Sequence, residues 1–88
     1  MLFVMLGKFK SKPTKELIAS INKYIEGLAK EGIVFKHMYW TLGRYDFAHV
    51  FEGPNEQAVM KALIGKSDVI STETLVAIPK EEIIKTLD

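Results

Sequence analysis

Hydrophobic positions along the chain form four runs with the spacing of β-strands. Residues 2–9 are almost continuously apolar, which is typical of a central strand covered on both faces. Residues 33–42 and 45–52 are rich in aromatic and branched side chains, and residues 69–78 alternate between apolar and polar positions. The pattern therefore predicts four strands, of which the middle two are neighbours in the sequence.

Two further segments carry apolar residues at the three-to-four-residue spacing of a helix. The first follows Pro13, which suits a first helical turn, and ends at Gly32. Its apolar stripe consists of Leu17, Ile18, Ile21, Tyr24, Ile25 and Leu28. The second begins at Pro54 and Asn55 and is followed by a loop over residues 65–68. Its apolar positions are Ala58, Val59, Ala62 and Leu63.

The order of these elements is strand, helix, strand, strand, helix, strand. This order predicts a ferredoxin-like βαββαβ fold of the α+β class, with a four-stranded antiparallel sheet and both helices on one face. The 88 residues suffice for one such domain, which we assign to residues 1–88. Pro79 starts a short C-terminal helix or tail over residues 79–88.

Gly43 and Arg44 lie between the second and third strands and predict a hairpin closed by a two-residue turn with glycine first. In that register the numbers of opposed residues sum to 87, so Met38 faces His49. His37 then points to the opposite face from His49, and the two histidines cannot share a metal ion within one chain. A register shifted by one residue would bring them together, so this expectation depends on the turn.

The register also determines the composition of the two faces of the hairpin. One face pairs Trp40 with Phe47, Met38 with His49 and Lys36 with Phe51. The other pairs Phe35 with Glu52, His37 with Val50, Tyr39 with Ala48 and Thr41 with Asp46. Neither face is polar enough to be left in water, so we expect a second copy of the chain to cover the face that the helices leave open.

The expected assembly is a homodimer or a higher even oligomer. Ile83, Ile84 and Leu87 are hard to bury within one small domain, and we expect them to dock on a neighbouring copy.

The composition excludes several kinds of chemistry. The chain has no cysteine, which excludes thiolate catalysis, Cys-ligated metals and disulfides, and favours a cytoplasmic location. The formal net charge is +1, and no apolar segment reaches the roughly 18 residues of a membrane span, so we expect no nucleic-acid or membrane partner. No ligand cluster, phosphate loop or pair of nucleophile and base is evident, so we expect no cofactor and no metal.

The strongest resemblance to a known family rests on three short runs. They are Tyr39-Trp40-Thr41-Leu42-Gly43-Arg44-Tyr45-Asp46, Glu52-Gly53-Pro54-Asn55 and Thr72-Glu73-Thr74-Leu75. They resemble the GYD domain family, named for the glycine, tyrosine and aspartate that stand here at Gly43, Tyr45 and Asp46. The resemblance implies a dimeric α/β barrel, built from two ferredoxin-like sheets paired face to face, in a family without an established biochemical function. Ser71 and Val76 stand where that family tends to have arginine, which argues against an anion site there.

A second resemblance is to the amino-acid-sensing domain of the leucine-responsive regulators. Its turn is approximated by Thr41, Gly43, Tyr45 and Asp46. The first helix is longer here, and no DNA-binding helix-turn-helix precedes it, so this resemblance ranks second. Both resemblances imply a small-molecule site at or near a subunit interface.

The residues that we expect to contact such a ligand are His37, Tyr39, Trp40 and Asp46, which lie nearest the hairpin. For Asp46 the plainer interpretation is that it caps backbone amides or bonds Thr41 and so fixes the hairpin.

Three function classes remain. The favoured one is a small-molecule binding or sensing module, with the ligand between sheet and helices or between subunits. A cofactor-independent enzyme of the small-monooxygenase kind shares the fold and would use His37 or His49 as a base. The aromatic run over residues 44–51 superficially resembles an RNA-recognition strand, but Asp46 and the near-zero charge argue against RNA binding.

Overall fold

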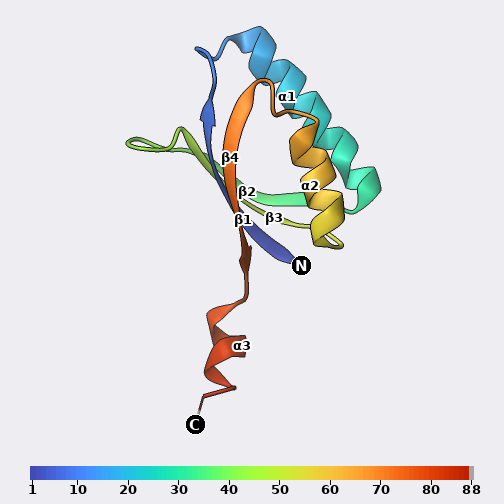
Figure 1. Ribbon diagram of the computed structural model, residues 1–88, viewed down its shortest axis with the longest axis vertical. Coiled ribbons are helices and arrows are strands. Elements are labelled where there is room, and N and C mark those ends of the chain that lie inside the picture. The colour runs from blue at the N-terminus through green and yellow to red at the C-terminus, as the bar shows by residue number, and fades with distance from the viewer. Residues whose placement is uncertain (88) are drawn as a thin grey trace.

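The two long helices both pack on one face of a four-stranded antiparallel sheet in the computed structural model, which describes residues 1–87 (Figure 1). The strands are β1 (Leu2–Phe9), β2 (Val34–Trp40), β3 (Phe47–Glu52) and β4 (Ile70–Ala77). The helices are α1 (Lys15–Leu28), the single turn η1 (Ala29–Glu31), α2 (Glu56–Ile64) and α3 (Lys80–Ile84). The strand order is β2-β3-β1-β4, so the predicted ferredoxin-like arrangement is confirmed, with β1 at its centre.

Side chains that cap the helices explain where α1 and α2 begin. The Thr14 hydroxyl accepts a hydrogen bond from the backbone N–H of Leu17 at 3.1 Å, and Asn55 Oδ1 accepts one from Ala58 N at 2.8 Å. Pro13 therefore precedes the cap and lies outside the first helical turn. The sequence had predicted Pro13 within that turn. Gly32 adopts a left-handed φ of 80° and ends η1, as predicted.

The register of the hairpin formed by β2 and β3 is confirmed near the loop and differs at the far end. Met38 pairs with His49 and Trp40 with Phe47, as predicted. A β-bulge between Phe35 and His37 then shifts the pairing, so that Phe35 lies opposite Phe51. The predicted pairs of Lys36 with Phe51 and Phe35 with Glu52 are therefore wrong.

The bulge has a clear physical effect. With Lys36 as the extra residue, Phe35 joins the helix-facing side, where its ring lies 4.8 Å from that of Phe51. Lys36 lies instead on the open face, where its Nζ is 3.7 Å from Glu52 Oε2. The bulge thus keeps a lysine out of the core, because two consecutive residues point away from the helices.

The hairpin loop is longer than the predicted two-residue turn, since β2 ends at Trp40 and β3 begins at Phe47. It is closed by a hydrogen bond from Thr41 N to Asp46 O at 2.8 Å and by one from the Thr41 hydroxyl to Tyr45 O at 2.7 Å. Gly43 has a φ of 112°, which explains the glycine at this position.

The core lies between the sheet and the two helices. Its buried side chains are Phe3, Met5, Leu28, Ile33, Phe47, Phe51, Val59 and Ala62. Tyr24 connects the helices, because its hydroxyl donates a hydrogen bond to Ala62 O at 2.8 Å.

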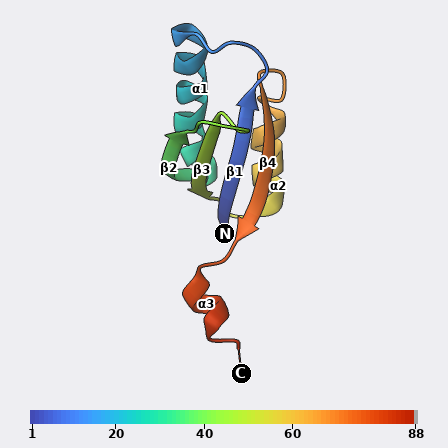
Figure 2. The same cartoon turned by 90° about the vertical axis from the view of Figure 1, so that its left-hand side faces the viewer.

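The C-terminal segment does not pack against the sheet as the two long helices do. Beyond β4 it leaves the sheet and carries α3 away from the body (Figure 2). The predicted short helix is therefore present, although residue 88 of the predicted range lies outside the described residues. Ile83 and Ile84 are exposed on α3, and Leu87 is exposed beyond its end.

Candidate functional site

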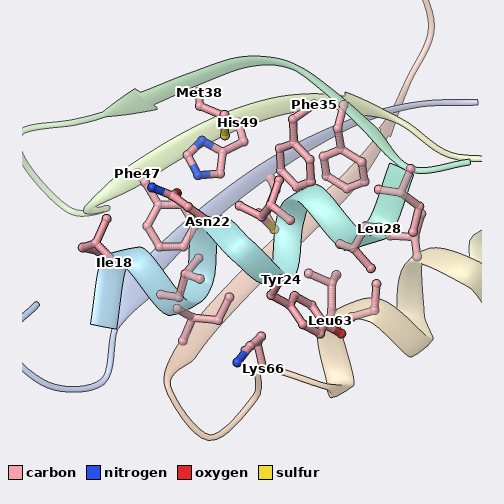
Figure 3. Close-up of a pocket in the computed structure, with 18 of the residues that line it drawn as sticks. Ile18, Asn22, Tyr24, Leu28, Phe35, Met38, Phe47, His49, Leu63 and Lys66 are labelled. Carbon is pink, nitrogen blue, oxygen red and sulfur yellow. The ribbon is translucent and has the colours of Figure 1, made fainter. Parts of the chain in front are cut away.

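A cavity of about 300 Å³ lies between α1 and the helix-facing side of the sheet (Figure 3). One wall consists of apolar residues from the first two turns and the middle of α1, including Ile18, Ile21 and Ile25. The opposite wall is formed by side chains of β1, β2 and β3, among them Phe35 and Phe47. Val59, Ala62 and Leu63 of α2 and Ile70 of β4 also line the cavity, so the site combines both long helices with the sheet and is almost entirely apolar.

The edge strand β2 borders the cavity and is incompletely covered by the helices. Met38 and Trp40 both line the cavity, yet they are 52% and 63% exposed. The helix-facing side chains of the central strands are much more deeply buried, as Met5 and Phe51 show. A small molecule can therefore reach the cavity at this edge of the sheet.

His49 is the polar residue of the sheet wall. Its ring lies 4.8 Å from the ring of Phe47 and 5.7 Å from that of Phe35. Its Nδ1 atom is buried and has no hydrogen-bond partner among residues 1–87. Burial lowers the pKa of His49 from its ordinary value of 6.5, and the backbone of Ala48 opposes part of this effect. The imidazole is therefore neutral at pH 7.

Three other polar side chains line the cavity. Asn22 of α1 lies on the same side of the cavity as His49, Met38 and Phe47 in Figure 3. Lys66 lies against Tyr24, with its Nζ 4.9 Å from the centre of the ring, and the Tyr24 hydroxyl is bonded to Ala62. The polar groups left for a ligand are thus concentrated at Asn22 and His49.

The four residues that the sequence proposed as ligand contacts do not come together in one chain. Trp40 lines the cavity. His37 and Tyr39 lie on the open face of the sheet, where their rings stack with centroids 6.1 Å apart. Asp46 is at the end of the hairpin, and its Oδ2 accepts a hydrogen bond from Phe9 N at 2.9 Å. The interpretation of Asp46 as a cap for backbone amides is confirmed, although the amide belongs to β1.

Asp46 and Trp40 also border a second, shallower hollow. Its other side is the loop that leads from β1 to α1, which contains Lys10 and Lys12. Lys10 is already engaged, because its Nζ donates a hydrogen bond to Ser67 O. This hollow is more open and less apolar than the cavity, and we do not assign a ligand to it.

Sequence reasoning missed Asn22, and it named His49 only as a possible base, without placing it against α1. The signal for Asn22 was available, because it follows Ile18 by four residues and so falls on the apolar stripe of α1. A polar residue within such a stripe points into the interior, where it needs a partner.

The histidines do not form a metal site. His37 and His49 point to opposite faces of the sheet, as the register predicted. Within residues 1–87, no three His, Cys, Asp or Glu side chains gather in an arrangement that could hold a metal ion. In the same part of the chain, no helix has the length and apolar character needed to cross a membrane.

Comparison with known proteins supports the resemblance seen in the sequence. No curated protein matches the chain. The GYD domain, however, matches residues 3–87, which include every strand and helix described above except the first residue of β1. This chain therefore belongs to the GYD domain family.

Proposed function

We propose that this protein is a small-molecule binding module that holds an apolar organic molecule between α1 and the sheet. The cavity is the observation that carries this proposal. Protein interiors pack as densely as organic crystals, and voids larger than a water molecule are few. A cavity of about 300 Å³ in a domain of this size is therefore more than a packing defect. Its apolar walls and few polar groups are typical of ligand pockets.

We also propose that the protein acts as a homodimer, with the open faces of two sheets in contact. The centre of this face is apolar on three adjacent strands, because Val4 of β1 pairs with Val50 of β3 and with Leu75 of β4. Polar residues lie towards its edges, where Lys36 pairs with Glu52 and Tyr45 donates a hydrogen bond to Glu73. An apolar centre with a polar rim is the usual arrangement of a protein interface.

Catalysis is the second candidate, and one observation favours it. A neutral imidazole beside a substrate-sized cavity has the protonation state that a general base requires. His49 has that state and that position. In such an enzyme the imidazole of His49 would take a proton from the bound molecule, without a cofactor.

Amino-acid sensing fits the cavity less well. A free amino acid brings a carboxylate and an ammonium group, which are costly to bury without charged partners. Among the described residues that line the cavity, Lys66 is the cation, and no side chain carries a carboxylate. An amino-acid site would therefore lie elsewhere, for example between subunits.

The experiment that tests the binding proposal begins with native mass spectrometry of the purified protein, which reports the number of subunits and any retained molecule. Naphthalene is then added as an apolar probe, and binding is followed through the fluorescence of Trp40, the single tryptophan, which lines the cavity. Ile21→Phe fills the cavity from α1 and should abolish binding. Met60→Phe, at an exposed position of α2, is the matched control and should bind like the parent.

Two results would contradict the proposal. One is a parent protein that retains no molecule and does not respond to naphthalene. The other is binding that survives Ile21→Phe unchanged, since the probe would then lie outside the cavity.

A further inference from the structure

We infer that the cavity and the shallower hollow beside it form one composite site, which takes a molecule with an apolar body in the cavity and an anionic end group in the hollow. This inference rests on the proposed function and specifies the chemical class of its ligand, a monoanion that is apolar except at one end. The hollow takes no ligand of its own and receives only the end of the molecule that extends beyond the cavity.

The two spaces share one thin wall. Among residues 1–87, Phe9 and Trp40 alone line both the cavity and the hollow. The centroids of their rings are 5.4 Å apart, with an angle of 60° between the ring planes, so the wall is a single layer of two side chains. Trp40 is 63% exposed, and exposed side chains change rotamer rapidly. A narrow chain can therefore pass from the cavity into the hollow beside Trp40.

The cavity accepts the apolar part of the molecule. Its most deeply buried lining residues are apolar, as Met5, Phe51 and Val59 show. The Nδ1 atom of His49 is itself buried, so it offers no surface to a bound group. A dry apolar cavity of about 150 Å³ in another protein accommodates benzene, and the cavity here has a volume of about 300 Å³. The body is therefore an apolar group of about the size of two fused rings.

The hollow carries a positive charge. One side of it is the loop from β1 to α1, and residues 8–15 contain four lysines and no acidic residue. Lys10 and Lys12 line the hollow together with one carboxylate, that of Asp46, so two positive charges stand against one negative charge. Oδ2 of that carboxylate is bonded to Phe9 N. An anionic group is therefore attracted to the hollow, whereas a cationic group is repelled.

Lys12 is the side chain that holds the anionic group. Lys10 is already engaged, because its Nζ donates a hydrogen bond to Ser67 O. The Lys12 side chain lines the hollow and forms no ion pair with any of residues 1–87. Since the ammonium group of Lys12 is in contact with water, its pairing with a carboxylate changes the affinity by up to about fivefold.

Four probes with the same naphthyl body separate these statements. They are naphthalene, 2-naphthoate, 4-(2-naphthyl)butyrate and 3-(2-naphthyl)propylammonium, titrated calorimetrically into the whole protein at pH 7.5 and low salt. In the last two, three methylene groups separate the charge from the rings, so that the charge can lie beyond Trp40. We expect the butyrate to bind about fivefold more tightly than the propylammonium, with a smaller difference at high salt. We expect 2-naphthoate to bind more weakly than the butyrate, because its carboxylate would be held inside the apolar cavity.

Three variants locate the two ends of the molecule. Lys12→Met removes the charge from the hollow and should weaken binding of the butyrate about fivefold, while naphthalene binds as in the parent. Lys15→Met, at the first residue of α1 and outside the lining of the hollow, is the matched control and should keep the parent affinity for the butyrate. Ile21→Phe, which fills the cavity, should abolish binding of all four probes.

The outcomes distinguish this inference from the function on which it rests. Equal affinities for the butyrate and the propylammonium, equally tight binding of 2-naphthoate and the butyrate, or a butyrate affinity that Lys12→Met and Lys15→Met change alike would overturn the inference. Binding of naphthalene would still leave a ligand cavity in place. Butyrate binding that survives Ile21→Phe would also overturn the inference, since the molecule would then lie in the hollow alone. If none of the four probes binds, the inference and the proposed function both fail.

Discussion

The carboxylate of Asp46 accepts a hydrogen bond at 2.9 Å from the backbone N–H of Phe9, a residue 37 positions earlier in the chain. The contact joins the hairpin loop to the end of the central strand. Two backbone bonds support it, from Asp46 N to Gly7 O and from Thr41 N to Asp46 O, each 2.8 Å long. Asp46 thus fixes the β2–β3 hairpin against β1, and with it the sheet wall of the cavity.

Replacing Asp46 by alanine should therefore destabilise the fold. The partly buried N–H of Phe9 would lose its acceptor, which typically costs about 1–3 kcal/mol. Asp46→Asn keeps an oxygen acceptor and should cost less. Urea denaturation of both variants measures the difference, and equal stabilities of Asp46→Ala and the parent would show that water replaces the carboxylate.

Gly7 is a second position where the fold depends on a close contact. A Cβ atom at Gly7 would overlap the ring of the buried Phe47. Gly7→Ala should lower the free energy of unfolding by about 1–3 kcal/mol, because the ring has to move within a packed core.

Gly27→Ala is the matched control for Gly7→Ala. Among residues 1–87, its added methyl group meets no atom within 4 Å apart from its chain neighbours and the adjacent backbone of α1, the helix in which it lies. Alanine is favoured over glycine in a helix by about 0.5–1 kcal/mol, so this variant should be more stable than the parent. Thermal unfolding followed by circular dichroism compares the two variants, and a Gly7→Ala protein as stable as the parent would contradict the overlap.

The bulge at Lys36 leads to a prediction about deletions. Phe35 pairs with Phe51 and His37 with Val50, and these partners are adjacent on β3. Removing Lys36 therefore leaves a regular ladder with every neighbour on its present face. The deletion should keep the fold, with the loss of an exposed ion pair that contributes at most about 1 kcal/mol.

Deletion of Tyr39 from the same strand is the control. With Trp40 kept on the helix-facing side, this deletion would place Met38 and Phe35 on the open face. The core would lose these side chains, and the protein should not fold. Circular dichroism spectra and melting curves show which of the two deletion variants folds. If both behave alike, Lys36 is not the extra residue.

The buried imidazole makes stability depend on pH. Because the pKa of His49 is lowered in the folded state, the unfolded chain binds more protons as the pH falls below about 6.5, its ordinary value. The free energy of unfolding should therefore decrease on acidification from that point, until the pH is below the folded pKa. In His49→Phe this contribution is absent, and the decrease should be shallower.

Urea denaturation at several pH values from about 7.5 to about 5 measures this slope. His37→Phe retains His49 and serves as the control for replacing a histidine on the sheet. A slope in His49→Phe as steep as that of the parent would place the pH dependence on other groups.

The open face of the sheet gives the prediction for assembly. Val50 lies at the centre of this face, opposite Val4. In the proposed dimer, Val50→Lys places two charges in the apolar centre of the interface, so the protein should become a folded monomer. Met60→Lys, at an exposed position on α2, should leave the dimer intact. Light scattering coupled to size-exclusion chromatography gives the masses, and a parent mass of one chain would refute the dimer.

Much of the fold could be predicted from the sequence, because its signals are local. Alternation and helical spacing gave the six elements in order, and the glycine at position 43 placed the hairpin and the register near it. The bulge also has a local signal that was overlooked. Lys36 and His37 are two consecutive polar residues between the apolar Phe35 and Met38, where strict alternation would have one.

The cavity had no such signal. Its volume depends on how far α1 lies from the sheet, which is a property of tertiary packing and not of residue spacing. The spacing correctly indicated that Ile18, Ile21 and Ile25 face the sheet, but it did not show that space remains between them and His49. For the same reason, the expected ligand contacts were residues near the conspicuous hairpin. Of these, His37 and Tyr39 lie on the face of the sheet opposite to the cavity.

The alternation of β3 has a consequence for how this protein can change. Its odd-numbered residues Phe47, His49 and Phe51 line the cavity, while Ala48 and Val50 belong to the open face. A substitution at one set leaves the shape of the other surface untouched, although the two sets are separated by a single peptide unit. In the proposed dimer with a ligand in the cavity, ligand preference and self-association could therefore be varied independently within one six-residue strand, by mutation in the laboratory or over evolutionary time.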